Sequence, residues 1–324
     1  MVILLMIFGS ILIATLMSSR TNTRIVYMGT PEFAVPPLEA LIEAGYTIPA
    51  VITVADKPAG RGRKLRESAI KVCAVRNGLK VLQPTNLKDE DFVTELRSLN
   101  ADLFIVVAFR MLPEIVWSMP ALGTFNLHGS LLPKYRGAAP IHWAIINGDR
   151  STGLTTFLLD KKIDTGGTLL QIEHPIKDGM TTGELHNVLM SLGPELVLNT
   201  VKGLVSGTLS PIAQNNELAT HAPKLNKDNS KLDLSKTPNE LVQQILGLNP
   251  FPGSYYGDFK FMRARVCSRM HASENPVLSV SEKRLYLDYP LGSVEIVEIK
   301  PNGKKNMDAK SFINGLKVAV LPLD

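Results

Sequence analysis

The chain has 324 residues, of which 45% are hydrophobic and 20% charged, and its formal net charge is +5. This length predicts about two domains that each bury a core, and the near-average charged fraction excludes a wholly disordered chain. The two cysteines, Cys73 and Cys267, are too few for a disulfide framework or a cysteine-rich metal cluster.

The N-terminal stretch from Met1 to Met17 contains no charged side chain. Its length is at the lower limit for a membrane-spanning helix, and it lacks the leading positive charge of a secretory signal. The first cation, Arg20, follows the stretch and would keep the body of the chain in the cytoplasm if the stretch inserted. We favour translation beginning at Met17, with a genuine anchor or a cleaved targeting sequence as alternatives, and place residues 1–23 outside the fold.

From Arg24 onward, short apolar runs alternate with segments of helical periodicity. The run 103–109 (LFIVVAF) is apolar without alternation, as in strands covered on both faces. The predicted strands are 24–29, 48–54, 79–83, 103–109, 123–130, 153–159 and 168–176; the predicted helices are 31–44 (with Thr30 as N-cap), 67–77, 88–99, 141–146 and 181–206. This order predicts an α/β fold with a doubly wound, mainly parallel sheet.

The composition changes after residue 207. Residues 208–236 are rich in Asn, Lys, Ser and Pro, show little periodicity and are interpreted as a linker. Beyond a predicted helix at 238–248, short strands separated by turns predict a small antiparallel β-barrel of the oligonucleotide-binding (OB) type. We therefore expect a first domain over 24–207, the linker 208–236 and a C-terminal domain over 237–324.

The first strand–helix turn, from Gly29 to Phe33, excludes a common cofactor motif. A dinucleotide-binding turn needs Gly-x-Gly-x-x-Gly so that the backbone can approach a pyrophosphate, whereas this turn has one glycine and a bulky Phe33. The chain also lacks a Walker A sequence. Nicotinamide, flavin and ATP chemistry are therefore not expected.

Asn126 and His128 lie two residues apart at the end of a predicted strand, so they share one face where open α/β sheets bind ligands. An amide donor beside an imidazole suits an oxygen that gains negative charge during acyl transfer. Asp164, in the run Asp-Thr-Gly-Gly, would orient the imidazole if the sheet brings the two together. A hydrogen-bonded strand end and an Asx-turn are the non-catalytic explanations. The remaining histidines are scattered, so we expect no metal site.

Positive charge concentrates in one segment of the chain. Residues 57–72 contain six basic side chains and one acidic side chain, so this segment alone carries the +5 of the whole chain. Any attraction for an anion should centre on this segment, although a solvated surface loop has the same composition.

Several motifs together resemble the formyltransferases that use 10-formyltetrahydrofolate. The motifs are NLHGSLLP at 126–133, GAAP at 137–140 and Asp164 at its spacing from His128. Three further segments resemble the members of this family that act on a charged tRNA: RIVYMGTPEFAV at 24–35, KPAGRGRKL at 57–65 and GLNPFPGSYY at 247–256. The resemblance runs from about Arg24 to the C-terminus and omits residues 1–23.

The resemblance implies a formyltransferase-like variant of the Rossmann sheet and a role for individual residues. Asn126, His128 and Asp164 correspond to the catalytic set. Two segments correspond to the site of the folate co-substrate, namely Ser130, Leu131, Leu132 and Pro133, and the loop residues Phe109, Arg110, Met111 and Leu112. The cations of the loop that enters the acceptor end of the tRNA are Lys57, Arg61, Arg63 and Lys64, and the C-terminal domain would hold the tRNA backbone.

The implied activity is transfer of the formyl group of 10-formyltetrahydrofolate to the α-amino group of methionine on initiator tRNA. The catalytic residues fit equally a formyltransferase acting on an amino sugar nucleotide or on glycinamide ribonucleotide. An RNA-binding protein with an inactive formyltransferase-like domain and a membrane-anchored protein are further alternatives. We expect a cytoplasmic monomer with no metal and no stable membrane association.

Overall fold

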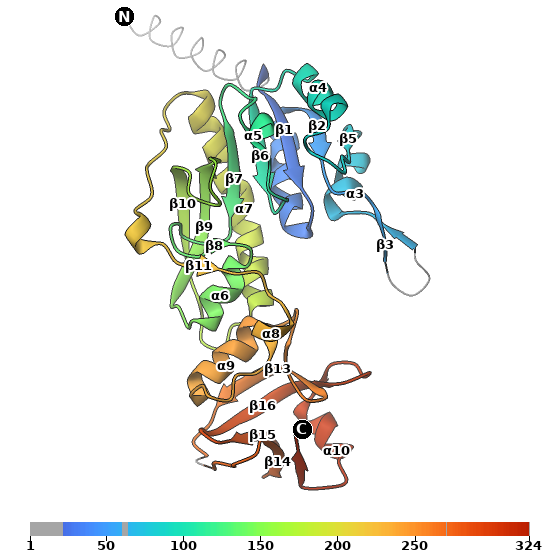
Figure 1. The fold of residues 1–324 in the computed structure, drawn as a ribbon, viewed down its shortest axis with the longest axis vertical. Coiled ribbons are helices and arrows are strands. Elements are labelled where there is room, and N and C mark those ends of the chain that lie inside the picture. The colour runs from blue at the N-terminus through green and yellow to red at the C-terminus, as the bar shows by residue number, and fades with distance from the viewer. Residues whose placement is uncertain (1–21, 60–63, 270, 324) are drawn as a thin grey trace, which may run out of the picture. The chain divides into compact units, whose positions relative to one another are not determined.

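The computed structural model describes residues 22–59, 64–269 and 271–323 (Figure 1). Nearly all of the predicted N-terminal extension, 1–23, therefore lies outside the described residues. The chain divides into two compact units, each built from segments that are separate in the sequence. Unit 1 comprises Met1–Pro133, Gly153–Ile172 and Leu189–Ala219, and unit 2 comprises Lys134–Thr152, Glu173–Val188 and Thr220–Asp324. The boundaries expected at 207 and 236 stay a prediction.

Seven strands form a mainly parallel sheet in the order β10-β9-β7-β6-β1-β2-β5. The strands are β1 (Arg24–Gly29), β2 (Thr47–Ile52), β5 (Val81–Leu82), β6 (Leu103–Val107), β7 (Thr124–His128), β9 (Ser151–Leu158) and β10 (Thr168–Pro175). β1 is parallel to β2 and β6, and β6 is parallel to β7, whereas β7 and β9 are antiparallel. The predicted doubly wound α/β sheet is confirmed, and its strand order reverses between β1 and β6.

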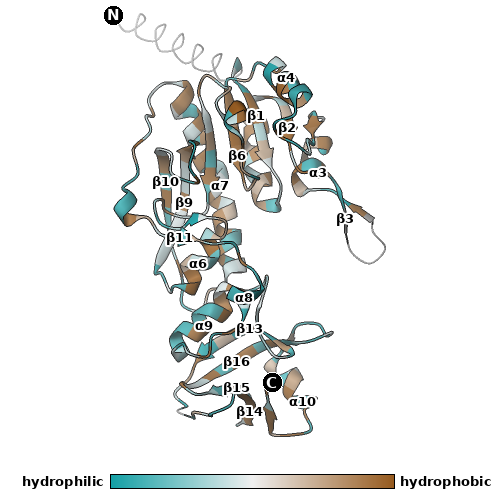
Figure 2. Cartoon of the chain, viewed as in Figure 1, coloured by the Kyte–Doolittle hydropathy of each residue, from teal (hydrophilic) through white to brown (hydrophobic). Residues whose placement is uncertain are grey.

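Helices cover this sheet on both faces. They are η1 (Glu32–Ala34), α2 (Val35–Glu43), α3 (Ala69–Arg76), α4 (Glu90–Ser98), α5 (Glu114–Trp117) and α7 (Thr182–Val205). On one face, Phe92 and Leu96 of α4 pack in a core cluster with Met28 and Phe104. On the other, the Tyr27 hydroxyl donates to the Ala34 carbonyl at 2.7 Å. All residues of β6 are buried, as the non-alternating sequence predicts, and β1 and β6 are among the brown strands of Figure 2.

The first helix begins later than the sequence predicts, and Thr30 is not its cap. Glu32–Ala34 form a 3-10 turn, in which the Ala34 amide donates to the Pro31 carbonyl at 3.0 Å. The α-helix begins at Val35, and its N-cap, Ala34, makes no side-chain capping bond. Prolines occupy the first helical turn, where their missing N–H groups leave fewer donors for a cap to satisfy.

The C-terminal part of unit 2 is a second seven-stranded sheet, with the path β12-β13-β16-β15-β14-β18 and β17 paired to β16. Its strands are β12 (Ser254–Tyr256), β13 (Phe259–Val266), β14 (Val277–Ser281), β15 (Arg284–Tyr289), β16 (Gly292–Pro301), β17 (Met307–Asp308) and β18 (Val320–Pro322). These pairs are antiparallel. The sheet is accompanied by α9 (Pro238–Gly247) and α10 (Ala309–Asn314), and it confirms the predicted small antiparallel β domain.

The segment interpreted as a linker carries short elements of its own, which are η2 (Asn216–Leu218), β11 (His221–Ala222) and α8 (Lys227–Ser230). β11 pairs in parallel with β8 (Arg136–Gly137). This pairing requires Gly137, because its φ is +124° and a Cβ there would lie 2.6 Å from the Ala222 carbonyl oxygen. The indole N–H of Trp143, on α6 (Pro140–Ile146), donates to the Pro223 carbonyl at 2.8 Å. The glycine of the GAAP motif is therefore required by the pairing of β8 with β11.

Among the described helices, α7 alone is long and apolar enough to cross a membrane. Its Leu189, Val197 and Val201 are fully buried inside the protein. Its Thr200 hydroxyl also shares a hydrogen bond of 2.8 Å with Thr156 of β9. The core helix of a soluble protein has the same length and composition, so this helix is weak evidence for a membrane span.

The packing of β6 predicts the effect of truncating its aromatic side chain. Phe104 is 1% exposed at the centre of the core cluster, so Phe104→Ala should lower the free energy of unfolding by about 3–5 kcal/mol. Leu218→Ala is the control, because Leu218 is 62% exposed and its truncation should change the value by less than about 0.5 kcal/mol. Urea titration of both variants tests this, and equal midpoints would contradict the assignment of the core.

Candidate active site

Strand β7 brings Asn126 and His128 to one end of the central sheet. Its pairing with β9 sets Asn126 opposite Phe157 and His128 opposite Thr155. His128 as a whole residue is 5% exposed, and its ring meets the Phe157 ring edge-on, at a centroid distance of 6.2 Å and an interplanar angle of 87°. The imidazole is therefore held in a largely dry environment with a defined orientation.

Asp164 reaches His128 from the loop between β9 and β10. Its Oδ2 lies 3.8 Å from Nδ1 of His128, and the two side chains are 15% and 6% exposed. The structure thus brings together Asp164, Asn126 and His128, although Asp164 is distant in the sequence. The separation between these two atoms is longer than a direct hydrogen bond.

The loop that carries Asp164 is shaped by its neighbours. Asp160 makes the turn-forming bonds, because its Oδ1 accepts from the Lys162 amide at 3.0 Å and from the Thr165 hydroxyl at 2.7 Å. Asp164 itself has a φ of +55°. Gly166 lies so close to β9 that a Cβ on it would be 1.7 Å from the Leu158 carbonyl oxygen. The Asp-Thr-Gly-Gly run therefore holds the Asp164 carboxylate near His128 and includes a glycine that the close approach to β9 requires.

Gln214 fixes the same loop from the segment that the sequence presents as a linker. Its Nε2 donates to the carbonyl of Asp164 at 3.0 Å and to the carbonyl of Gly166 at 2.7 Å. One side-chain amide thus anchors the backbone on both sides of Thr165. Sequence reasoning did not identify Gln214, because a single glutamine in a polar, non-periodic stretch carries no local signal.

The segment after His128 is held by Thr155, which is fully buried. The Thr155 hydroxyl donates to the Ser130 carbonyl at 2.6 Å and accepts from the Leu132 amide at 3.0 Å. Gln171 of β10 extends this network, donating to Thr155 Oγ1 at 2.9 Å and to the Leu132 carbonyl at 2.8 Å. Ser130 and Leu132 are buried within it, and we name Thr155 and Gln171 the loop clamp.

The second loop of the expected donor site follows β6. Arg110 fastens it, because its guanidinium donates to the carbonyls of Pro84 and of Thr85, the latter at 2.8 Å. Burial lowers the pKa of this guanidinium from its ordinary value. Leu112 is 6% exposed and belongs to the core, whereas Met111 is 70% exposed.

The basic segment forms a hairpin of β3 (Lys57–Ala59) and β4 (Lys64–Arg66), which the sequence analysis treated as a loop. Its predicted tRNA-contacting residues Lys57 and Lys64 lie on these strands, whereas Arg61 and Arg63 fall outside the described residues.

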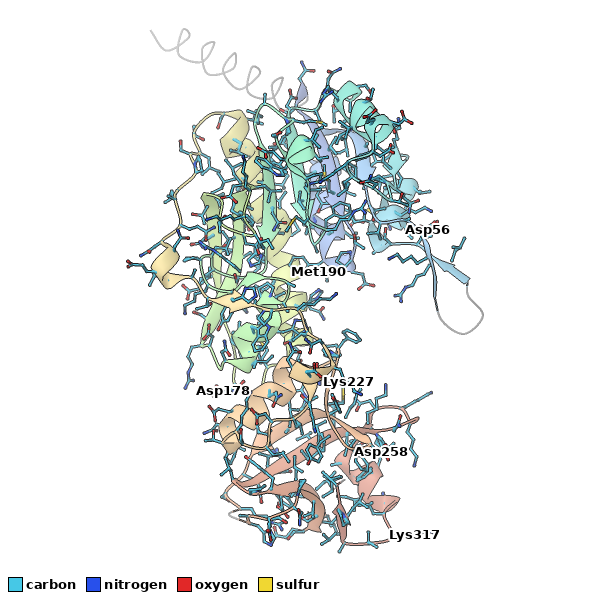
Figure 3. All side chains as sticks on the ribbon, viewed as in Figure 1. Asp56, Asp178, Met190, Lys227, Asp258 and Lys317 are labelled. Carbon is cyan, nitrogen blue, oxygen red and sulfur yellow. The ribbon has the colours of Figure 1, made fainter. Side chains whose placement is uncertain are left out.

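An acidic pair at the base of the hairpin, where Figure 3 labels Asp56, engages a cation of the basic segment that lies on α3. The Lys71 ammonium pairs with Asp56 and, at 2.9 Å, with Glu67. The Lys71 ammonium and then the Gln83 amide hold the pKa of the Asp56 carboxyl below its ordinary value. Lys71 therefore contributes to anchoring the hairpin rather than to its free positive charge.

The arrangement of unit 1 suits reactions at a carbonyl or formyl carbon. An amide, an imidazole and a carboxylate surround one strand end, and they supply a hydrogen-bond donor, a proton-transfer group and a group that orients it. The site adjoins the ends of β6 and β7, close to the reversal of strand order where α/β sheets bind ligands.

Family models match both halves of the chain. The model described as formyl transferase matches residues 23–201, and the model described as formyl transferase, C-terminal domain, matches residues 224–317. Named relatives match along nearly their whole length. A methionyl-tRNA formyltransferase of Flavobacterium johnsoniae is 46% identical over 303 residues, covering 90% of this chain and 96% of the relative. One of Bacteroides thetaiotaomicron is 43% identical, with 93% and 98% covered.

Solved structures share the fold at low sequence identity. An N-formyltransferase of Helicobacter canadensis, in complex with folinic acid and dTDP-3-aminofucose, is 21% identical with a TM-score of 0.66, covering 85% of this chain and 98% of that protein. HypX of Aquifex aeolicus, in complex with tetrahydrofolic acid, is 15% identical with a TM-score of 0.62. This chain is 90% covered in that match and spans 47% of the longer HypX chain.

The loop clamp predicts a local effect of removing one hydroxyl. Thr155→Val keeps the shape of the side chain but removes the hydroxyl that binds the Ser130 carbonyl and the Leu132 amide, which should cost about 1–3 kcal/mol of stability. Amide hydrogen exchange at Leu132 should accelerate accordingly. Thr155→Ser retains the hydroxyl and should exchange like the unaltered chain, and equal exchange in all three proteins would refute the clamp.

Proposed function

The chain belongs to the formyl transferase family, and on this premise we propose that it transfers the formyl group of 10-formyltetrahydrofolate to the α-amino group of methionyl-tRNA, the initiator of translation. The observation that carries this proposal is full-length similarity. Relatives that are methionyl-tRNA formyltransferases are 41–46% identical, and this chain covers 96–98% of their length. The chain is therefore a one-carbon transferase that uses a folate-type donor.

The reaction joins the amine nitrogen to the formyl carbon and breaks the bond from that carbon to N10 of the folate. The attacking amine must be neutral, and because α-amino groups titrate near pH 7.7–8.0 a useful fraction already is. In the tetrahedral intermediate the formyl oxygen carries negative charge. The amine loses a proton and the folate nitrogen gains one, so the proton count balances.

Asn126, His128 and Asp164 are assigned to these steps. Asn126 donates a hydrogen bond to the formyl oxygen, and protonated His128 stabilises the oxyanion and delivers a proton to the leaving nitrogen. Asp164 orients the imidazole and accepts the amine proton, directly or through a water molecule. The 3.8 Å separation of Asp164 and His128 supports this assignment, because catalytic contacts in unliganded sites commonly shorten when substrate binds.

The donor is assigned to the space beside these residues. The segment Ser130–Pro133, held by Thr155 and Gln171, forms one wall. The loop Phe109–Leu112, fastened through Arg110, forms the other, and its apolar side chains suit a flat pterin ring. The backbone of the first segment is held by side chains of β9 and β10, and the second loop is held through Arg110 by the carbonyls of Pro84 and Thr85, so both geometries are set before the donor arrives.

The charged tRNA is assigned to the basic hairpin. The cations Lys57, Arg61, Arg63 and Lys64 pair with phosphates near the acceptor end of the tRNA. The charged tRNA belongs to the translation machinery of the cytoplasm, where we place the protein as a monomer without a stable membrane attachment.

The deciding experiment is transfer of labelled formyl from 10-formyltetrahydrofolate to three acceptors: methionine-charged initiator tRNA, glycinamide ribonucleotide and an amino sugar nucleotide. The proposal expects label on the charged tRNA alone. Label on a small amine alone would retain the catalytic set but replace the acceptor. No transfer to any acceptor would refute the enzymatic proposal and favour an RNA-binding protein without activity.

Removing either polar group of β7 should abolish most turnover. Asn126→Ala and His128→Ala should each lower kcat by about 10²–10³-fold, the usual loss for one oxyanion donor, in a single-turnover formyl transfer assay. His221→Ala is the control, because this histidine is exposed on β11. Near-normal turnover in either β7 variant would remove that residue from the mechanism.

Removing a cation from the basic hairpin should affect one substrate selectively. Arg61→Ala should raise KM for the charged tRNA about fivefold and leave KM for the folate donor unchanged, since an exposed charge contact contributes up to about 1 kcal/mol. Lys88→Ala, at an exposed position outside the basic segment, is the matched control. Equal changes in both KM values would count against the hairpin as a tRNA contact.

A further inference from the structure

Unit 2 contains a concave site that the proposed reaction does not use. It encloses about 730 Å³ on the C-terminal sheet, between β12, β13, β16 and the start of α8. Four of its lining residues are lysines, namely Lys227, Lys260, Lys300 and Lys304, against a single acid, Asp258. Figure 3 labels Lys227 and Asp258, which come from different elements of this region. The hollow therefore combines a confined volume with an excess of positive charge.

Strand register explains why an aromatic ring and two of these cations share one face. Tyr255 of β12 pairs with Lys260 of β13, and Lys260 pairs with Lys300 of β16, so the three residues form one row across the sheet. The adjacent row, Ser254–Phe261–Ile299, is fully buried in the core. Because side chains alternate along each strand, the row of Tyr255, Lys260 and Lys300 points to the opposite, open face.

Lys260 is fixed in place. Its ammonium donates to the Pro252 carbonyl at 2.7 Å. Its stem passes over Gly253, where a Cβ would lie 3.2 Å from Lys260 Cδ, and Gly253 has a φ of +81°. A side chain at residue 253 would press against the lysine stem, so the glycine of the GLNPFPGSYY motif leaves room for Lys260 beside the hollow. The Lys260 ammonium thus places a positive charge beside Tyr255 at a position that is fixed before any ligand binds.

We propose that this site binds one unstacked nucleotide of the tRNA, with its base against the Tyr255 ring and its flanking phosphates on Lys260, Lys300 and Lys304. The proposal rests on the proposed function, which supplies the RNA. A basic groove beside an aromatic face is the combination by which proteins hold single-stranded nucleotides. The volume lies within the usual range for small-ligand sites and accommodates a base and its ribose. A lipid headgroup would engage the lysines but would make no use of the Tyr255 ring.

The test is binding of uncharged initiator tRNA to the full chain, followed by fluorescence anisotropy at several salt concentrations. Tyr255→Leu should weaken binding about tenfold, because loss of one base–aromatic stack costs about 1–3 kcal/mol, whereas Tyr255→Phe should bind like the unaltered chain. Lys300→Ala should reduce the slope of log K against log salt by about 0.7, the value for one phosphate contact on a single strand. Lys317→Ala is the matched control, at an exposed position of the same domain outside the hollow.

Each outcome decides the proposal. Thermal unfolding of every variant shows whether the fold is intact. If Tyr255→Leu is unstable, the test rests on the other two variants. The site is then supported when Lys300→Ala binds the tRNA more weakly and Tyr255→Phe binds it like the unaltered chain. Normal binding by a folded Tyr255→Leu would refute the stacked base. Normal salt dependence of Lys300→Ala would refute the phosphate contact. Failure of the proposed function looks different, because the unaltered chain would then transfer no formyl group to the charged tRNA, whatever its affinity.

Discussion

The backbone pairing of β7 with β9 is the constraint on which the candidate site depends. It sets His128 opposite Thr155 and Asn126 opposite Phe157. Because successive side chains point to opposite faces, a shift by one residue would turn both polar side chains of β7 away from Asp164. On the other side of β9, two glycines allow the close approach of β10 and the loop before it, because a Cβ at Gly153 would lie 2.0 Å from the Ile172 carbonyl oxygen, and one at Gly166 would lie 1.7 Å from that of Leu158.

Three uncharged side chains convert this register into a rigid site. Thr155 and Gln171 hold the segment after His128, and Gln214 holds the loop that carries Asp164. Each binds backbone carbonyls, so the positions of the proposed catalytic residues depend on main-chain geometry. A site organised in this way loses little entropy when its substrates bind, which is how positioning lowers an activation barrier.

Sequence patterns predicted the elements that carry strong local signals. The apolar run of β6 indicated a strand buried on both faces, and all its residues are buried. The prediction of Thr30 as a helix cap was wrong. Its side chain has the chemistry of a cap, but a 3-10 turn follows it and the α-helix begins only at Val35.

By itself, the sequence determined which chemical groups are available: the Asn-x-His pair, the Asp-Thr-Gly-Gly run and the concentration of positive charge at 57–72. Only the tertiary structure decided which of them meet. The approach of Asp164 to His128 and the capture of Lys71 by Asp56 are contacts between segments distant along the chain. The row of Tyr255, Lys260 and Lys300 likewise exists only through strand pairing. Local patterns encode the period of an element, whereas the neighbours of an element follow from the register in which the strands pair.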